Sequence, residues 1–337
     1  MTEPAELVFV GGTGRSGTTV LGSLLGRHPR FYGVPIESRF HCNPKGLADV
    51  VGGRASAEEF VRKLRTYWWY RIRVGQHALV PAGVVGRARV ALNRAGARLR
   101  PGDGSEARVR GLHQIVPRGR FDAAVARFEE THERDLVPAS RTLFYDLLGP
   151  LAAEAGKPAL VEMSCFTIAA APELARIFPE ARFVHAVRDG RDSGASKAEL
   201  REKDHHPTDA ASGIDFWADR LRQAEEGVRG LEPADRERLH VVGLDDLVSG
   251  DREGAYAGLL DFLGVEDEAA MRRFFDREMT PEAAHLERWR EGLGEAEQRE
   301  VTERYAATLD RLERERYHCA TVLRRAYERT LAPQPSA

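Results

Sequence analysis

The chemistry that this sequence could perform is concentrated first in a turn near its N-terminus. Residues 7–10 are apolar and precede two glycines, as in a buried strand that enters a tight turn. Backbone N–H groups at the start of the helix that follows lack partners inside the helix, and the helix dipole adds positive potential there. We therefore predict a phosphate or sulfate site built from Gly14, Arg15, Ser16, Gly17, Thr18 and Thr19.

The turn differs from the phosphate-binding loop of nucleoside triphosphatases, G-x-x-x-x-G-K-[ST], in one position. Gly12 and Gly17 have the required spacing, but Thr18 stands where that loop has its lysine. The lysine contacts the β- and γ-phosphates beside Mg²⁺, so its absence disfavours ATP or GTP hydrolysis. Arg15 is then the cation of the turn, facing a group on a 5′-phosphate.

A second anion site is predicted in the middle of the chain. A buried strand expected over 183–187 ends at Arg188, and Ser196 follows eight residues later on the next helix. This spacing brings both side chains to one phosphate, to which arginine offers a two-pronged fork and serine a single donor. A simple salt bridge between Arg188 and Asp192 is the alternative interpretation.

The combination of motifs is similar to that of a known family. GRSGTT after a strand, then His28-Pro29, then Glu37-Ser38-Arg39 resemble the sulfotransferases that use 3′-phosphoadenosine 5′-phosphosulfate (PAPS). The bacterial and tyrosylprotein branch is the most similar. The resemblance implies that the turn 14–19 holds the 5′-phosphosulfate, that Glu37 deprotonates the acceptor hydroxyl, and that Arg39 lies near the acceptor.

The resemblance also implies roles for residues of the second half of the chain. Arg188 and Ser196 correspond to the residues that bind the 3′-phosphate, and Arg288, beside Trp289, to a cation that closes over it. Arg290 is a weaker candidate for that cation. In one position the chain departs from the family, because Met163 stands where similar proteins often carry a lysine that stabilises the transferring group. Two interpretations stay open: Arg15 takes over that charge, or Met163 is core packing.

The elements that must position these residues alternate between strands and helices. Strands are expected at 7–10, 159–163, 183–187 and 239–244, with helical segments between them. Crossover connections of this length require parallel pairing. The fold class is therefore α/β: a three-layer, P-loop-like sulfotransferase fold with a central parallel sheet. A single domain is expected over 1–337, with residues 46–150 as a helical cap inserted on the acceptor side.

The predicted cap is strongly basic. Residues 54–120 hold fifteen Lys and Arg against four acids, with aromatic residues at 67–70 and a helical pattern over 84–99. One interpretation is a helical insertion with solvated arginines. Another is a surface for an anionic or membrane-associated acceptor, which allows peripheral membrane contact through 54–120. Binding of single-stranded nucleic acid is disfavoured, since the net charge of the chain is only −2.

Composition indicates the size of the core, the location of the protein and whether it needs a metal. Its 337 residues, 42% hydrophobic, suffice for a real core, and no apolar run approaches membrane-spanning length. Three widely separated cysteines and no signal peptide suggest a reducing, cytoplasmic location. Neither cysteines nor histidines have metal-site spacing, so no metal is expected.

The sequence thus predicts transfer of a sulfuryl group from PAPS to an acceptor hydroxyl on a small molecule, a glycan or a lipid-linked group. Glu37 and Arg15 are the expected catalytic residues. A nucleotide-dependent small-molecule kinase is one alternative, which the missing lysine opposes. A non-catalytic module that binds anions or nucleic acid through its basic region is the other.

Overall fold

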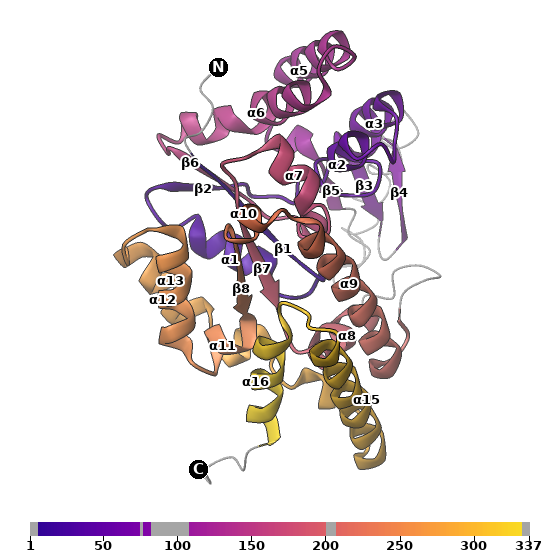
Figure 1. Cartoon of the computed structure of the whole chain (residues 1–337), viewed down its shortest axis with the longest axis vertical. Coiled ribbons are helices and arrows are strands. Elements are labelled where there is room, and N and C mark those ends of the chain that lie inside the picture. The colour runs from indigo at the N-terminus through magenta and orange to yellow at the C-terminus, as the bar shows by residue number, and fades with distance from the viewer. Residues whose placement is uncertain (1–5, 75–76, 82–107, 200–206, 332–337) are drawn as a thin grey trace, which may run out of the picture.

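A central sheet of five parallel strands organises the molecule (Figure 1). The computed structural model describes residues 6–74, 77–81, 108–199 and 207–331. The strand order of the sheet is β2-β6-β1-β7-β8. The strands are β2, Phe31–Gly33, β6, Ala159–Glu162, β1, Glu6–Gly12, β7, Arg182–Val187, and β8, Leu239–Gly243. Phe9 pairs with Glu162 on one side and Phe183 on the other, so β1 is the middle strand. The predicted parallel sheet is confirmed, with β2 as a further strand.

Helices cover both faces of this sheet, which gives the three predicted layers. Val8 and Val10 face a core that includes α1, Thr18–Leu25, α12, Arg252–Leu263, and α13, Ala269–Glu278. Leu7 and Phe9 point the opposite way, because successive side chains of a strand alternate. They face α6, Leu136–Glu154, α7, Ala171–Ile177, and α9, Ala210–Gly230. Figure 1 shows α12 and α13 on one side of the sheet and α7 and α9 on the other.

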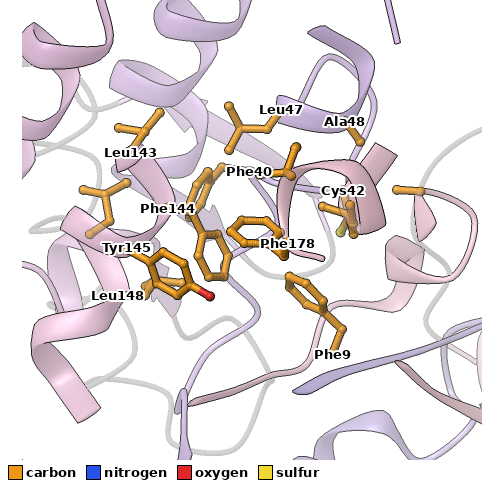
Figure 2. Close-up of a cluster of buried hydrophobic side chains, with 14 of the residues drawn as sticks. Phe9, Phe40, Cys42, Leu47, Ala48, Leu143, Phe144, Tyr145, Leu148 and Phe178 are labelled. Atoms are coloured by element: carbon orange, nitrogen blue, oxygen red, sulfur yellow. The ribbon is translucent and has the colours of Figure 1, made fainter. Parts of the chain in front are cut away.

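The core on the α6 side is rich in aromatic rings (Figure 2). Phe9 lies 5.8 Å from Phe144 and 5.6 Å from Phe178, ring centre to ring centre, in edge-on contacts. Phe40 joins the same cluster at 5.8 Å from Phe144. Because Phe40 follows Glu37 by three residues, this packing helps to fix the segment after β2 on the face of the sheet.

A third core holds the C-terminal helices against α9. It contains Trp217, Trp289 and Tyr305, all buried, and connects α9 to α15, Glu295–Arg314, and α16, Ala320–Leu331. The remaining short helices are α8, Gly190–Ala198, α10, Pro233–Arg236, α11, Leu244–Val248, and α14, Pro281–Ala284. Trp289 is the residue that ties the segment carrying Arg288 into this core.

The segment 46–150, which was predicted as a helical cap, contains strands as well as helices in its described residues. Its helices are α2, Leu47–Val51, α3, Ala57–Lys63, α5, Arg118–Thr131, and α6, with a π-helical turn over Leu64–Trp68. Strands β3, Arg71–Val74, β4, His77–Pro81, and β5, Arg108–Arg110, form an antiparallel sheet in the order β4-β3-β5. Charged and apolar residues alternate in β3, a period of two that favours a strand. The cap is therefore not purely helical, and the helix expected over 84–99 lies outside the described residues.

The aromatic residues at 67–70 pack inside the insertion. Trp68 is 1% exposed, and the ring of Trp69 lies 4.2 Å from that of Phe121 on α5. Tyr70 contacts His113 at 4.5 Å. These contacts pack the rings against the rest of the segment, with Trp68 buried and Tyr67, Trp69 and Tyr70 partly exposed. No helix of the described ranges is long and apolar enough to cross a membrane.

Candidate active site

The turn after β1 has the backbone of an anion-binding loop. Gly14, Arg15 and Gly17 have φ values of +81°, +60° and +90°, in the left-handed region that glycine adopts without strain. A side chain on Gly12 would lie 2.5 Å from the carbonyl oxygen of Ala186, so the turn can approach β7 only with glycine there. Helix α1 then begins at Thr18, which leaves its first N–H groups at the turn.

Arg15 connects this turn to the second predicted anion site. Its Nε donates a hydrogen bond of 2.8 Å to Oγ of Ser196 on α8, 181 residues further along the chain. The side chain of Ser16 is fully buried, and its Oγ has no hydrogen-bond partner among the described residues. The turn 14–19 and Ser196, which were predicted separately, therefore line one site at the carboxyl ends of β1 and β7.

Arg188 lies under the same turn and is 7% exposed. Its Nη1 donates to the carbonyl oxygen of Arg15 at 3.4 Å, and its Nη2 donates to those of Ala284 and His285 at 2.6 and 2.9 Å. Asp192 lies 3.6 Å away, so the ion pair considered from the sequence exists alongside these contacts. Nε of Arg188 has no partner among the described residues.

Asp192 fixes the segment that carries the third predicted cation. Its carboxylate accepts hydrogen bonds from the backbone N–H of Glu287 at 2.9 Å and of Trp289 at 3.1 Å. Burial and the neighbouring Asp189 raise the pKa of Asp192 to about 6. Arg288, which lies between Glu287 and Trp289, forms an ion pair of 2.6 Å with Glu199, one residue past the end of α8. Arg288 therefore lies along the same helix as Ser196.

Glu37 and Arg39 lie on the other side of the turn, after β2. Oε2 of Glu37 accepts hydrogen bonds from Nε of Arg39, at 2.5 Å, and from its Nη2. Oε1 of Glu37 accepts a hydrogen bond of 3.5 Å from the thiol of Cys165. A side chain at Gly14 would lie 3.8 Å from that sulfur, so Glu37 faces the turn across Cys165. Burial and the charge of Glu37 raise the pKa of Cys165 to about 12, which keeps the thiol protonated.

A buried ionic network that the sequence analysis missed holds this segment. Glu162, at the end of β6, accepts hydrogen bonds from the backbone N–H and hydroxyl of Ser38 at 3.0 and 2.9 Å, and from Ser164 at 2.7 Å. Its other oxygen pairs with His41 at 3.0 Å. Ser164 in turn accepts from the backbone N–H of Arg39 at 3.1 Å. The only signal in the sequence is a glutamate at the end of an apolar strand, where a charge needs a buried partner.

The charges of this network stabilise each other. Burial alone would lower the pKa of His41, but the neighbouring Cys42 and the Glu162 carboxylate raise it to about 10. Burial would raise the pKa of Glu162, but His41 and the hydrogen bonds of the serines lower it. Both groups are therefore charged at neutral pH although they are fully buried. The ion pair and its hydrogen bonds attach the segment 37–41 to the end of β6.

Met163 belongs to the core and not to the site. It is 6% exposed and packs with the side chains between the sheet and α1. A Cβ on Gly22 of α1 would lie 2.6 Å from its sulfur. Of the two interpretations of this residue, core packing is the one observed.

Two further cations were missed from the sequence. Lys197 follows Ser196 on α8, and Arg220 lies on the neighbouring helix α9. Burial, and then the positive charges of Arg220, Arg15 and Arg39, lower the pKa of Lys197, while Cys165 has the opposite effect. Lys197 therefore shares the electrostatic environment of the turn and of the Glu37 segment.

The fold and the positions of these groups define a class of protein. Anion-binding groups at the carboxyl ends of neighbouring parallel strands are typical of α/β enzymes that bind nucleotides. The model of the sulfotransferase family matches residues 7–269, and the chain belongs to this family. It is accordingly a transferase with the sulfotransferase fold.

Comparisons with individual proteins are more distant. No match is found among curated proteins. The sulfotransferase domain of the olefin synthase of Synechococcus PCC 7002 has 16% identity and a TM-score of 0.44, covering 91% of this chain and 95% of that one. The domain from the curacin biosynthetic pathway has 15% identity and a TM-score of 0.43, covering 85% and 84%. Sulfotransferase STF1 of Mycobacterium tuberculosis H37Rv has 17% identity and a TM-score of 0.44, covering 91% of this chain and 78% of that one.

Proposed function

We propose that this protein transfers a sulfuryl group from PAPS to an acceptor hydroxyl. One observation carries the proposal: the hydrogen bond between Arg15 and Ser196 joins the two anion-binding motifs, and Glu37 lies beside them across Cys165. A ligand with negative groups at two positions and a reacting centre near a carboxylate fits this arrangement. Family membership supplies the reaction class.

The residues at the nucleotide end suit an anionic ligand. Oγ of Ser16 and Nε of Arg188 are buried polar atoms without partners among the described residues, and buried groups of this kind normally have one. In the proposal, the backbone of Gly14, Ser16, Gly17, Thr18 and Thr19 holds the 5′-phosphosulfate together with Arg15. Arg188 and Ser196 bind the 3′-phosphate, and Arg288, held beside the end of α8 by Glu199, closes over it.

At the acceptor end, Glu37 takes the proton of the acceptor hydroxyl. Arg39 holds Oε2 of Glu37, which leaves Oε1, on the Cys165 side, to face the acceptor. The acceptor oxygen then forms a bond to sulfur as the bond between sulfur and the phosphate oxygen breaks, and 3′-phosphoadenosine 5′-phosphate leaves. Arg15 and the N–H groups of the turn stabilise the charge that develops on the sulfuryl and phosphate oxygens.

The acceptor class proposed from the family is a hydroxyl of a small molecule, a glycan or a lipid-linked group. Peripheral membrane contact through residues 54–120 stays a prediction, and it rests mainly on the arginines, because Trp68 is buried and Trp69 packs against Phe121. A cytoplasmic location is proposed from the three unpaired cysteines. That the reaction needs no metal is likewise a prediction.

Nucleotide binding tests the donor assignment directly. We expect 3′-phosphoadenosine 5′-phosphate to raise the melting temperature at concentrations where ATP does not, since a ligand that binds the folded state stabilises it. Label transfer from ³⁵S-PAPS to a panel of phenols, sugars and lipid-linked glycans then tests the reaction. Stabilisation by ATP with phosphate transfer would favour the kinase. Salt-sensitive nucleic-acid binding that survives Arg15→Ala and Glu37→Gln would favour the non-catalytic module.

A further inference from the structure

Lys197 and Arg220 form a second group of positive charges, beside Phe166 and Phe216 and distinct from the residues proposed to bind the donor. Nζ of Lys197 lies 5.5 Å from the ring centre of Phe216, and the guanidinium of Arg220 lies 5.1 Å from the same ring. Arg220 also stacks at 4.7 Å on Phe166, the residue after Cys165. Contacts of a guanidinium with two rings fix its plane and leave its edge for an anion.

Close packing of two helices brings these residues together. The backbones of α8 and α9 touch at Gly194 and Gly213, where a Cβ on Gly194 would lie 2.5 Å from the carbonyl carbon of Gly213 (Figure 1). Lys197 lies one helical turn beyond Gly194, and Phe216 one turn beyond Gly213, so both follow directly from the crossing point. Arg220 is one further turn along the same face of α9. The crossing of the two helices therefore brings both cations to the same side.

The two cations differ from Arg39, Arg288 and Arg188 in their partners. Arg39 is paired with Glu37, Arg288 with Glu199, and Arg188 with Asp192 and three carbonyl oxygens. No carboxylate of the described residues lies within ion-pairing distance of Lys197 or Arg220, and the hydrogen bond of Arg220 goes to the amide of Gln223, at 3.0 Å. Both side chains are half-buried, and burial is the main cause that lowers their pKa values.

The position of the pair points to the acceptor. Arg220 stacks on Phe166, the residue after Cys165, whose thiol donates to Glu37, and Lys197 shares the ring of Phe216 with Arg220. The proposed contacts of the nucleotide are instead at Arg188, Ser196 and the turn 14–19. We infer that the acceptor carries a carboxylate, sulfate or phosphate group close to its reacting hydroxyl, and that Lys197 and Arg220 bind this group. The inference rests on the proposed function, because it takes Glu37 as the base and the turn as the donor site.

Binding of inorganic sulfate to the donor-loaded protein tests this subsite. The donor site is first filled with the PAPS analogue in which a methylene group replaces the oxygen between phosphorus and sulfur, so that its sulfonate occupies the sulfuryl position. Sulfate is then titrated against chloride at constant ionic strength and followed by calorimetry. We expect one saturable sulfate site in the parent protein, weakened roughly tenfold or more in Arg220→Gln and in Lys197→Met.

Arg222→Gln is the matched control, because Arg222 lies on α9 two residues further on but is exposed and pairs with Asp219 and Glu226. Its sulfate affinity should equal that of the parent protein. The subsite would be overturned if the loaded protein showed no saturable sulfate binding, or if Arg220→Gln left that binding intact. In either case, binding of the analogue would still support the donor assignment. If the analogue itself does not bind, the donor assignment fails, and the subsite fails with it.

Discussion

The two halves of the site are held by different means. The turn 14–19 takes its shape from its own backbone, with Gly14 and Gly17 in left-handed conformations and α1 starting directly after them. The segment 37–41 is held from outside, by Glu162, which is 124 residues from Ser38 in the chain. One half is therefore a local motif. The other depends on a buried ion pair that forms only when β2 and β6 lie side by side.

Because the two halves are held by different means, we expect substitutions near Glu37 to change turnover and substitutions at the nucleotide end to change nucleotide binding. The largest expected effect is at Glu37, where Glu37→Gln removes the base but keeps an oxygen that can accept from Arg39. Turnover should fall roughly 10²–10⁴-fold, while the affinity for 3′-phosphoadenosine 5′-phosphate stays unchanged. Steady-state rates with ³⁵S-PAPS and calorimetry with the product nucleotide measure the two quantities separately.

Glu58→Gln is the control for this substitution, since Glu58 is an exposed residue in the first turn of α3. It should change neither rate nor affinity. Turnover of Glu37→Gln equal to that of the parent protein would remove Glu37 from the mechanism. A loss of nucleotide affinity in that variant would show that the two halves are not separable.

The next largest effect is expected at Glu162. Glu162→Ala leaves His41 buried without its carboxylate partner and removes the acceptor of both serine hydroxyls and of the Ser38 N–H. Breaking a buried pair from one side costs about 3–5 kcal/mol of unfolding free energy. Urea denaturation measures this loss, and turnover should fall with it because the segment that carries Glu37 loses its fixing point.

An exposed ion pair provides the comparison for Glu162. Glu129 of α5 pairs with Arg65 at 2.6 Å, but both side chains are exposed. Such pairs contribute about 0–1 kcal/mol, so Glu129→Ala should be nearly neutral. Equal losses for the two variants would mean that the buried network does not hold the segment as described.

The same contrast explains what could be predicted from the sequence. Glycines and apolar runs are local signals, and from them the parallel sheet could be predicted. That the turn and Ser196 serve one ligand was implied only by the family resemblance. Partners far apart in the chain gave no such signal. Glu162 with His41, and Lys197 with Arg220, became visible only when strands and helices were packed together. The strands of the insertion were missed because charge and aromatic content outweighed the alternation in β3.

A smaller effect is expected at the nucleotide end, from Arg188→Ala. Loss of hydrogen bonds to a charged phosphate costs about 1.5–3 kcal/mol, or roughly 10–100-fold in affinity. The loss should apply to 3′-phosphoadenosine 5′-phosphate and not to adenosine 5′-phosphate, which lacks the second anion. Calorimetry gives the ratio of the two affinities within each variant, which cancels any general effect of losing the carbonyl contacts of Arg188.

Exposed Arg176 on α7 is the matched control, and Arg176→Ala should leave this ratio at the parent value. An equal loss of affinity for both nucleotides in Arg188→Ala would refute the 3′-phosphate assignment. Arg188 would then act through the carbonyl oxygens of Arg15, Ala284 and His285 alone, as a structural residue.

The last expected effect is a gradual pH dependence of stability that belongs only to the half of the site that carries Glu37. His41 keeps its proton in the folded protein up to a pKa of about 10, whereas an unfolded histidine loses it near its usual pKa of 6.5. The ion pair therefore stabilises the fold fully below pH 6.5, and this contribution declines as the pH rises toward 10, by at most about 1.4 kcal/mol per pH unit. Denaturation of the parent protein and of Glu162→Gln between pH 6.5 and 9.5 measures it. The difference in unfolding free energy between the two proteins should shrink with rising pH, because His41 loses its proton and other titrating groups are common to both. A constant difference would mean that His41 is neutral in the folded state.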